Sequence, residues 1–237
     1  MSGESTVRIA LLLPDVLGTY SDGGNATVLA QRLRWRDVPA QVLRVPAEQT
    51  PPTDCDVFVL GGGEDAAQVY AADWLRRHSA LRAAMQRSQV VAVCAGLQVL
   101  GAWMQGVDGR RHPGADLLDL TTAPGGTRAV GELVTHGTHP QIGILTGFEN
   151  HRGHTTLGPG IRPLGHVQSG TGNGDGSDGV LTDTVVGTYL HGPVLARNPD
   201  LADLILRRVT GQPTLPPLSV PHENAARAYH LALASHR

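Results

Sequence analysis

"QVVAVCAGLQVLG", residues 89–101, is the stretch that decides the fold. A run of small and β-branched apolar residues leads into Cys94, and Ala95 and Gly96 follow before a helix-like pattern begins. Such a run is typical of a buried strand, and a strand that leads straight into a helix is the repeating unit of a parallel sheet. We therefore expect a buried strand ending at Cys94, a sharp turn, and a short helix from Gly96 to about Met104.

The same alternation of strand and helix precedes this stretch. Strands are predicted at 7–14, 38–45 and 56–65, and helices at 21–37 and about 64–87. Ser21 or Asp22 is the expected N-cap of the first helix, because both residue types accept hydrogen bonds from a first helical turn. The pattern predicts an α/β fold with a mostly parallel sheet flanked by helices on both faces.

The second half of the chain favours short strands and turns. The Gly/Asp-rich segment 169–180 is expected to form the tip of a hairpin, and another strand is predicted at 184–192. A helix should span 198–211, with Asn198 as its cap and Gly211 as its stop, and a last helix should lie near 222–235. Without an internal repeat, residues 1–237 are expected to form a single domain.

Composition excludes several classes of function. The formal net charge of −2 carries no basic footprint for nucleic acid, and the 19 cationic residues are all arginine. The apolar run at 7–14 is too short to span a bilayer. Two cysteines do not make a disulfide framework, so a cytoplasmic location is the expectation.

Cys94 is the predicted nucleophile. In an open parallel sheet, sites lie at the carboxyl ends of strands, and the small residues around Cys94 resemble a strained nucleophile elbow. The helix that follows should favour the thiolate and lower the thiol pKa below its ordinary value of roughly 8.5. Cys55, which precedes a strand, is interpreted as a structural cysteine.

A cysteine nucleophile needs a general base, and His191 is the candidate. It ends the strand "VVGTYLH", at the same edge of the sheet, and a Gly-Pro turn follows. Backbone N–H groups of Gly62 and Gly63, together with that of Ala95, could form an oxyanion hole. A phosphate site is the competing interpretation, but the chain has no lysine to complete a P-loop.

Histidine pairs raise the question of a metal. His136 and His139, and again His151 and His154, are spaced three residues apart. They lie in Gly-rich segments without cysteine or acidic ligands at matching spacing, so no metal site is expected.

Three motifs carry a resemblance to a known family. "VAVCAGLQVLG" resembles the Cys-x-Gly-x-Gln nucleophile motif of class I glutamine amidotransferases. "TYLHGPVLARNPDLAD" and "GFENHRGHT" narrow the resemblance to the cobyric acid synthase-like branch and, within it, to the GatD-like glutaminase subunits. The resemblance extends over about 7–210.

The resemblance implies a function and a set of site residues. Cys94 would be the nucleophile, His191 the general base, Gln98 a substrate contact and Arg128 the partner of the substrate α-carboxylate. Glutamine would be hydrolysed to glutamate and ammonia, with no cofactor in this chain. The ammonia would pass to a MurT-like Mur ligase subunit, which would hold ATP and magnesium and amidate the D-glutamate of lipid II to D-isoglutamine during peptidoglycan biosynthesis.

Two alternatives stay open. The chain could supply ammonia to another ATP-dependent synthetase, such as a corrin-amidating one, or it could be a non-catalytic binding module on the same fold. The simultaneous presence of Cys94, Gln98 and His191 argues against the binding module.

One position departs from the wider class I pattern. Pro193 stands where most class I members carry a glutamate that orients the histidine. The acid must therefore come from elsewhere. Our hypothesis is that the partner subunit supplies it, which would make the isolated chain slow, and Glu149 is the first candidate if the acid lies within this chain.

Overall fold

The computed structural model describes residues 6–106, 108–218 and 232. Its main sheet has the strand order β11-β12-β4-β3-β1-β2. The five strands β1, β2, β3, β4 and β12 are parallel, and β11 pairs antiparallel with β12 at one edge. The bounds are β1 (Val7–Leu12), β2 (Ala40–Val45), β3 (Val57–Leu60), β4 (Gln89–Val93), β11 (Val180–Leu181) and β12 (Val185–Thr188).

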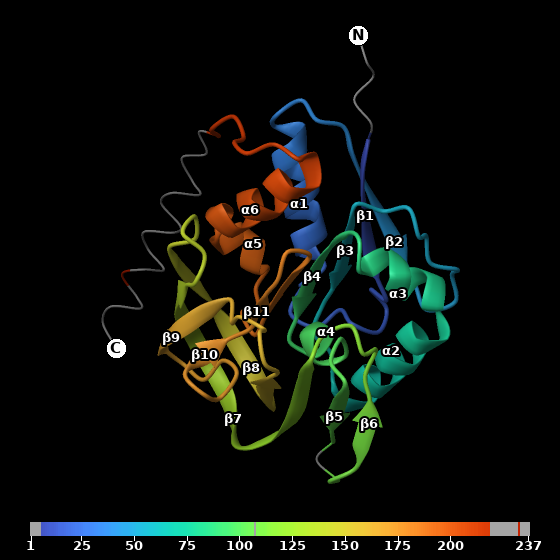
Figure 1. The fold of residues 1–237 in the computed structure, drawn as a ribbon, viewed down its shortest axis with the longest axis vertical. Helices are drawn as coiled ribbons and strands as arrows, with labels where there is room; N and C mark the ends of the chain where they lie inside the picture. The colour runs from blue at the N-terminus through green and yellow to red at the C-terminus, as the bar shows by residue number, and fades with distance from the viewer. Residues whose placement is uncertain (1–5, 107, 219–231, 233–237) are drawn as a thin grey trace.

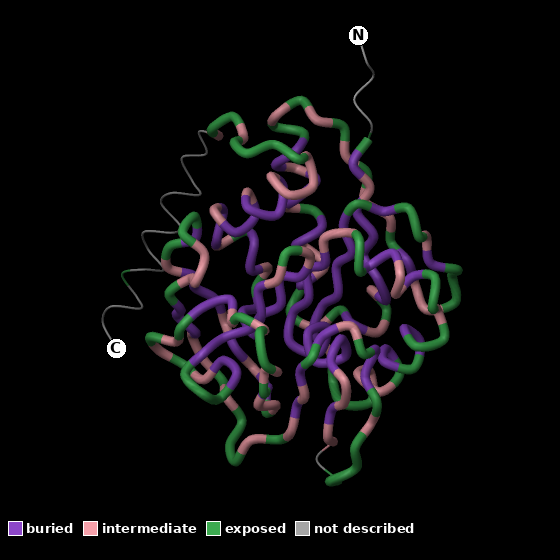
Figure 2. The backbone as a smooth tube through the Cα atoms, in the orientation of Figure 1, coloured by how far each residue is buried: buried purple, intermediate pink, exposed green. Residues whose placement is uncertain are grey.

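Helices cover both faces of this sheet, as predicted (Figure 1). On one side lie α1 (Gly24–Arg34), α5 (Val194–Arg197) and α6 (Pro199–Thr210), and on the other lie α2 (Asp65–Arg77) and α3 (Ser79–Met85). The single turn α4 (Ala95–Gln98) follows β4 directly. Every residue of β3 and nearly all of β1 and β4 are buried, which is why these strands read as continuous apolar runs (Figure 2).

A second sheet, which the sequence did not predict, has the order β10-β9-β7-β5-β6, with β8 paired to β7. Its strands are β5 (Trp103–Gln105), β6 (Arg111–Pro113), β7 (Leu120–Gly137), β8 (Ile144–Leu157), β9 (Gly165–Ser169) and β10 (Ser177–Asp178). The expectation of short strands is wrong for β7 and β8, which form a long antiparallel ribbon.

The two sheets are joined at the strand end that carries His191. The N–H of His191 donates to the carbonyl of Phe148 in β8 at 2.7 Å. This bridge places the long ribbon beside the carboxyl edge of the main sheet, so that side chains from both sheets can face one space.

Two predicted helices are shorter than expected. The helix expected over 64–87 breaks at His78, whose backbone leaves the helical region at φ −106° and ψ 69°. The helix expected from Gly96 to Met104 ends after one turn. At Gly101 the chain passes so close to Leu120 that a Cβ would lie 2.4 Å from that side chain, and it then runs into β5 beside β7.

Other expectations hold. The segment 169–180 is a hairpin tip between the antiparallel strands β9 and β10. Helix α6 ends at Gly211 in the left-handed conformation, with φ 67°. The helix expected near 222–235 falls, except for residue 232, outside the described residues. Within the described residues, we find no helix with the length and apolar character that crossing a membrane requires.

Candidate active site

Cys94 occupies a strained turn between β4 and α4. Its backbone has φ 52° and ψ −109°, a region that non-glycine residues rarely adopt. Its N–H donates to the carbonyl of Thr188 in the neighbouring strand at 2.8 Å, which holds the turn at the carboxyl end of the sheet. A Cβ at Gly96 would lie 2.8 Å from both the Cβ and the carbonyl oxygen of Leu60, so the turn requires glycine there. The predicted sharp turn at Cys94 is confirmed, and the role of Cys94 as nucleophile stays a prediction.

His191 has its orienting acid inside this chain. Nδ1 of His191 lies 2.8 Å from Oδ2 of Asp22, and both side chains are fully buried. Nε2 of the same ring has no hydrogen-bond partner among the described residues, and His191 and Cys94 line the same cavity. A carboxylate at Nδ1 fixes the tautomer that leaves Nε2 free to accept a proton.

Asp22 therefore corrects two expectations. It is not the N-cap of α1, which begins at Gly24 with Gly23 as its cap. The acid also does not need to come from a partner, because Asp22 fills the place that Pro193 leaves vacant in the motif. The signal that could have found it is its position after β1, at the same carboxyl edge as Cys94.

Gly62 serves the histidine–acid pair rather than the predicted oxyanion hole. Its N–H donates to Oδ2 of Asp22 at 3.0 Å. A Cβ at this position would lie 2.8 Å from Cε1 of His191 and 3.1 Å from Oδ2 of Asp22. Of the predicted donors, Ala95 and Gly63 remain, and the Ala95 backbone hydrogen-bonds to the Cys94 thiol.

Glu149, the candidate acid within the chain, orients a different histidine. Its Oε2 lies 3.1 Å from Nε2 of His151, and its two oxygens accept the N–H groups of Thr171 at 2.8 Å and Gly172 at 3.0 Å. Nδ1 of His151 faces the carbonyl of Gly153 at 3.0 Å. The Glu149–His151 pair therefore connects β8 to the 170–176 turn.

Burial raises the pKa of the Cys94 thiol to about 12, and the negative charges of Asp22 and Glu64 act in the same direction. The Ala95 hydrogen bond and the charge of Arg128 oppose this shift. The expected lowering of this pKa is therefore wrong, because desolvation outweighs a helix of one turn. A raised pKa favours the neutral thiol over the thiolate.

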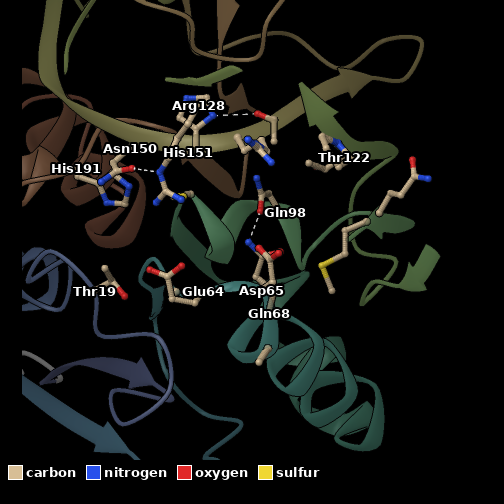
Figure 3. Close-up of a pocket in the computed structure, with 18 of the residues that line it drawn as sticks. Thr19, Glu64, Asp65, Gln68, Gln98, Thr122, Arg128, Asn150, His151 and His191 are labelled. Atoms are coloured by element: carbon tan, nitrogen blue, oxygen red, sulfur yellow. Dashed lines mark hydrogen bonds between the residues drawn. The ribbon is translucent and has the colours of Figure 1, made fainter. Parts of the chain in front are cut away.

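A cavity of about 510 Å³ opens above the thiol. Figure 3 shows its two sides: Glu64, Asp65 and Gln68, at the start of α2, lie across from residues of the β7–β8 ribbon. Arg128 is one of the ribbon residues, and its Nε donates to Oδ1 of Asn150 at 2.6 Å. That bond leaves the two terminal nitrogens of the guanidinium for a ligand.

Gln98 lines the cavity with both ends of its amide engaged. Its nitrogen donates to the Tyr189 hydroxyl at 2.9 Å, and its oxygen accepts from the Gln68 amide at 2.7 Å, as a dashed line in Figure 3 marks. Its role as a direct substrate contact stays a prediction. Tyr189 stacks on His151 and accepts the hydrogen bond of Gln98. Tyr189 was not identified from the sequence as a site residue, because no motif around it distinguishes it from an ordinary strand residue.

Cys55, interpreted as a structural cysteine, does not line this cavity. Cys55 is buried and unbonded to another cysteine, and burial raises its thiol pKa to about 11. Among the residues described by the structure, no group of three or more histidine, cysteine, aspartate or glutamate side chains is placed to hold a metal ion.

Comparison with solved structures supports the fold. A structure described as a glutamine amidotransferase superposes with a TM-score of 0.55 at 16% identity, over 85% of this chain and 98% of its own. The glutaminase domain of Trypanosoma brucei CTPS gives a TM-score of 0.53 at 12% identity, over 92% and 98%.

Comparison with curated proteins gives more specific relatives. The subunit GatD of lipid II isoglutaminyl synthase (glutamine-hydrolyzing) from Staphylococcus aureus is 33% identical over 86% of this chain and 84% of its own length. The Streptococcus pneumoniae subunit is 31% identical over 83% and 77%. Cobyric acid synthase from Hyphomonas neptunium is 33% identical over 81% of this chain but only 37% of its own length.

The family model described as a CobB/CobQ-like glutamine amidotransferase domain matches residues 8–199. This range includes Asp22, Cys94 and His191, so the match covers both the main sheet and the assembled site. The chain belongs to the family of CobB/CobQ-like glutamine amidotransferase domains.

Proposed function

We propose that this protein is the glutamine-hydrolysing subunit of a lipid II isoglutaminyl synthase. The observation that carries the proposal is that Cys94 and His191 line one cavity, while the buried carboxylate of Asp22 lies 2.8 Å from Nδ1 of His191. The two relatives named for that synthase activity match over most of their own length.

The first half of the reaction forms a thioester. Nε2 of His191 takes the proton of the Cys94 thiol as the sulfur attacks the side-chain amide carbon of glutamine. The N–H groups of Ala95 and Gly63 are the proposed donors to the oxygen of the tetrahedral intermediate. His191 then returns the proton to the leaving nitrogen, the C–N bond breaks, and ammonia departs from a glutamyl thioester.

The second half regenerates the thiol. His191 takes a proton from water, whose oxygen attacks the thioester carbon, and the C–S bond breaks to release glutamate. The sulfur recovers a proton from the imidazolium. Asp22 stays ionised and stabilises the imidazolium in both halves, which is the role of the acid in comparable triads.

Arg128 is the proposed anchor of the substrate α-carboxylate. Because Asn150 binds Nε, the guanidinium plane is fixed while its terminal nitrogens remain available for a bidentate contact. Gln98 is proposed to close the floor of the cavity, held in place by Tyr189 and Gln68.

The proposed partner is a MurT-like Mur ligase subunit. It would hold ATP and magnesium, activate the D-glutamate α-carboxylate of lipid II, and receive the ammonia made here, giving D-isoglutamine. Because that step consumes ATP, we propose that the complex works in the cytoplasm. Lipid II would be bound by the partner.

Glutaminase and amidation assays test the proposal separately. The purified chain should release glutamate from glutamine, and Cys94→Ala should abolish this release while the fold is retained. A glutamine-derived electrophile should label Cys94 and spare Cys55, so labelling chiefly at Cys55 would overturn the assignment of the nucleophile.

Co-expression with a MurT-like subunit should yield a complex that amidates lipid II with ATP and glutamine. Glutaminase activity without lipid II amidation, but with amidation of a corrin substrate by another synthetase, would favour the alternative partner. Absence of any glutamine hydrolysis in the complex would favour the binding module.

A further inference from the structure

Tyr20 lies at the mouth of the cavity and contacts both halves of the site. It lines the cavity together with Thr19, yet 38% of its surface is exposed. The mechanism above does not use it. Its hydroxyl and its ring make separate contacts.

The hydroxyl of Tyr20 begins a chain that ends at the substrate anchor. It accepts a hydrogen bond from the side-chain nitrogen of Asn150. The oxygen of that same amide accepts from Nε of Arg128 at 2.6 Å. Since an amide has one donor end and one acceptor end, the bond to Tyr20 fixes which end faces Arg128.

The ring of Tyr20 covers the general base. Its centroid lies 4.8 Å from the imidazole of His191 at an interplanar angle of 66°, and 5.6 Å from the ring of Phe148. His191 is fully buried although it lines the cavity, and Tyr20 is one of the two aromatic rings packed edge-on or tilted against it. The edge-to-face arrangement restricts rotation of the imidazole.

The backbone supports a functional reason for this position. Tyr20 and Ser21 both adopt positive φ, 59° and 61°, and neither is glycine. Strained non-glycine residues concentrate where a site needs a particular side-chain placement. The next residue is Asp22, the acid of the triad, so the strained turn places the ring and the acid on the same imidazole.

The geometry points to Tyr20 as a positioning residue with two separable actions: its hydroxyl orients Arg128 through Asn150, and its ring holds the imidazole of His191. The inference rests on the proposed glutaminase function. It predicts that loss of the hydroxyl weakens glutamine binding, whereas loss of the ring slows the chemical step.

Two substitutions separate these actions. Tyr20→Phe keeps the ring and removes the hydroxyl, and we expect KM for glutamine to rise about two- to tenfold with kcat nearly unchanged, as for one neutral hydrogen bond. Tyr20→Leu removes both, and we expect the same rise in KM with an additional fall of about two- to tenfold in kcat, as for one aromatic pair. Tyr70→Phe is the matched control, because Tyr70 is an exposed tyrosine of α2 that does not line the cavity.

A double substitution tests the route through Asn150. If the hydroxyl acts only through that amide, Tyr20→Phe should raise KM in the wild-type background and add nothing in Asn150→Ala. Thermal unfolding of each variant checks that the chain is folded, and Tyr20→Phe carries the test alone if Tyr20→Leu does not fold.

Each part of the inference has its own contradicting result. An active wild type whose KM is unchanged by Tyr20→Phe overturns the hydroxyl's action, and additive effects with Asn150→Ala overturn its route. Equal kcat values for the Phe and Leu variants overturn the action of the ring. A wild type without glutaminase activity, alone and in complex, instead refutes the proposed function on which the inference rests.

Discussion

Substitution of Asp22 by asparagine and by leucine should lower glutaminase activity by different amounts. In the structure one oxygen, Oδ2, accepts from two donors, Nδ1 of His191 at 2.8 Å and the N–H of Gly62 at 3.0 Å. The other oxygen, Oδ1, is buried without a partner among the described residues. This asymmetry determines what each replacement can do.

Asparagine should keep the tautomer of His191. Turning the amide nitrogen toward His191 would set it against the Gly62 N–H, donor against donor, so the amide oxygen should stay in the Oδ2 position. Only the charge is then lost, and hydrogen bonds to charged groups are worth about 1.5–3 kcal/mol, which corresponds to a fall of roughly 10- to 100-fold in kcat. Leucine removes both the charge and the acceptor, and the fall should approach the ~10⁴-fold known for a triad with a misoriented histidine.

The assay is glutamate release by the isolated chain at saturating glutamine. Thermal unfolding and labelling of Cys94 by a glutamine-derived electrophile control for misfolding. If both variants keep kcat within about threefold of wild type, Asp22 does not act on His191. If asparagine is as damaging as leucine, the constraint that we assign to Gly62 is wrong.

Three further perturbations test the site and its support. Arg128→Ala should raise KM for glutamine by roughly 10- to 100-fold, since a charge-assisted bidentate contact is lost, as steady-state kinetics can measure. In a Cys55→Ala background, the rate at which iodoacetamide alkylates Cys94 should still be rising at pH 10, because burial raises this thiol pKa to about 12. Burial raises the pKa of Asp178 from 3.8 to about 6. The stabilisation that its protonated form gives should be full below pH 4 and should decline by at most about 3 kcal/mol as pH rises through 6. Urea titrations of wild type and Asp178→Asn measure this decline as the pH dependence of the difference in their free energies of unfolding.

Arg128→Lys keeps the charge without the fork and should fall between wild type and alanine, whereas an unchanged KM in Arg128→Ala would make Arg128 a solvated arginine. A plateau in alkylation near pH 7 would mean that the Cys94 thiolate is already stabilised at rest. If the difference in free energy of unfolding between wild type and Asp178→Asn does not change with pH, the pKa of Asp178 is not raised in the folded protein.

The strands, the sharp turn at Cys94 and the position of His191 could be predicted because each depends on neighbouring residues. The apolar run before Cys94 and the small residues after it specify a buried strand and a tight turn within a dozen positions. The strand that leads to His191 has the same local signature, and parallel strands bring their carboxyl ends to one edge.

Asp22 could not be assigned in the same way because it is 169 residues from His191 in the chain. An aspartate before a helical pattern is also the usual signature of an N-cap. The local sequence therefore favours an N-cap over a contact with a distant histidine. Only the sheet topology, which places the end of β1 beside that of β3, brings the acid next to Gly62 and so to the imidazole.

The second sheet was missed for a different reason. Residues of β7 from Ala123 to Glu132 are exposed or half-buried and include Pro124 and three glycines, so they lack the apolar alternation that indicates a strand. Pairing with β8 stabilises this segment instead. Arg128 and Asn150 face the cavity only because of that pairing, so neither was placed by local pattern.

Because the acid lies within this chain, the hypothesis of a triad completed by the partner loses its basis, and the isolated chain should hydrolyse glutamine. Control by a partner must then act on groups that it can reach. Asp22 and His191 are fully buried, whereas Tyr20 is 38% exposed at the cavity mouth and connects through Asn150 to Arg128. We therefore expect the proposed partner subunit to change KM for glutamine more than kcat, and Tyr20→Phe to reduce that change. Steady-state kinetics of the chain alone and in complex measures both constants, and a partner effect confined to kcat would contradict this reasoning.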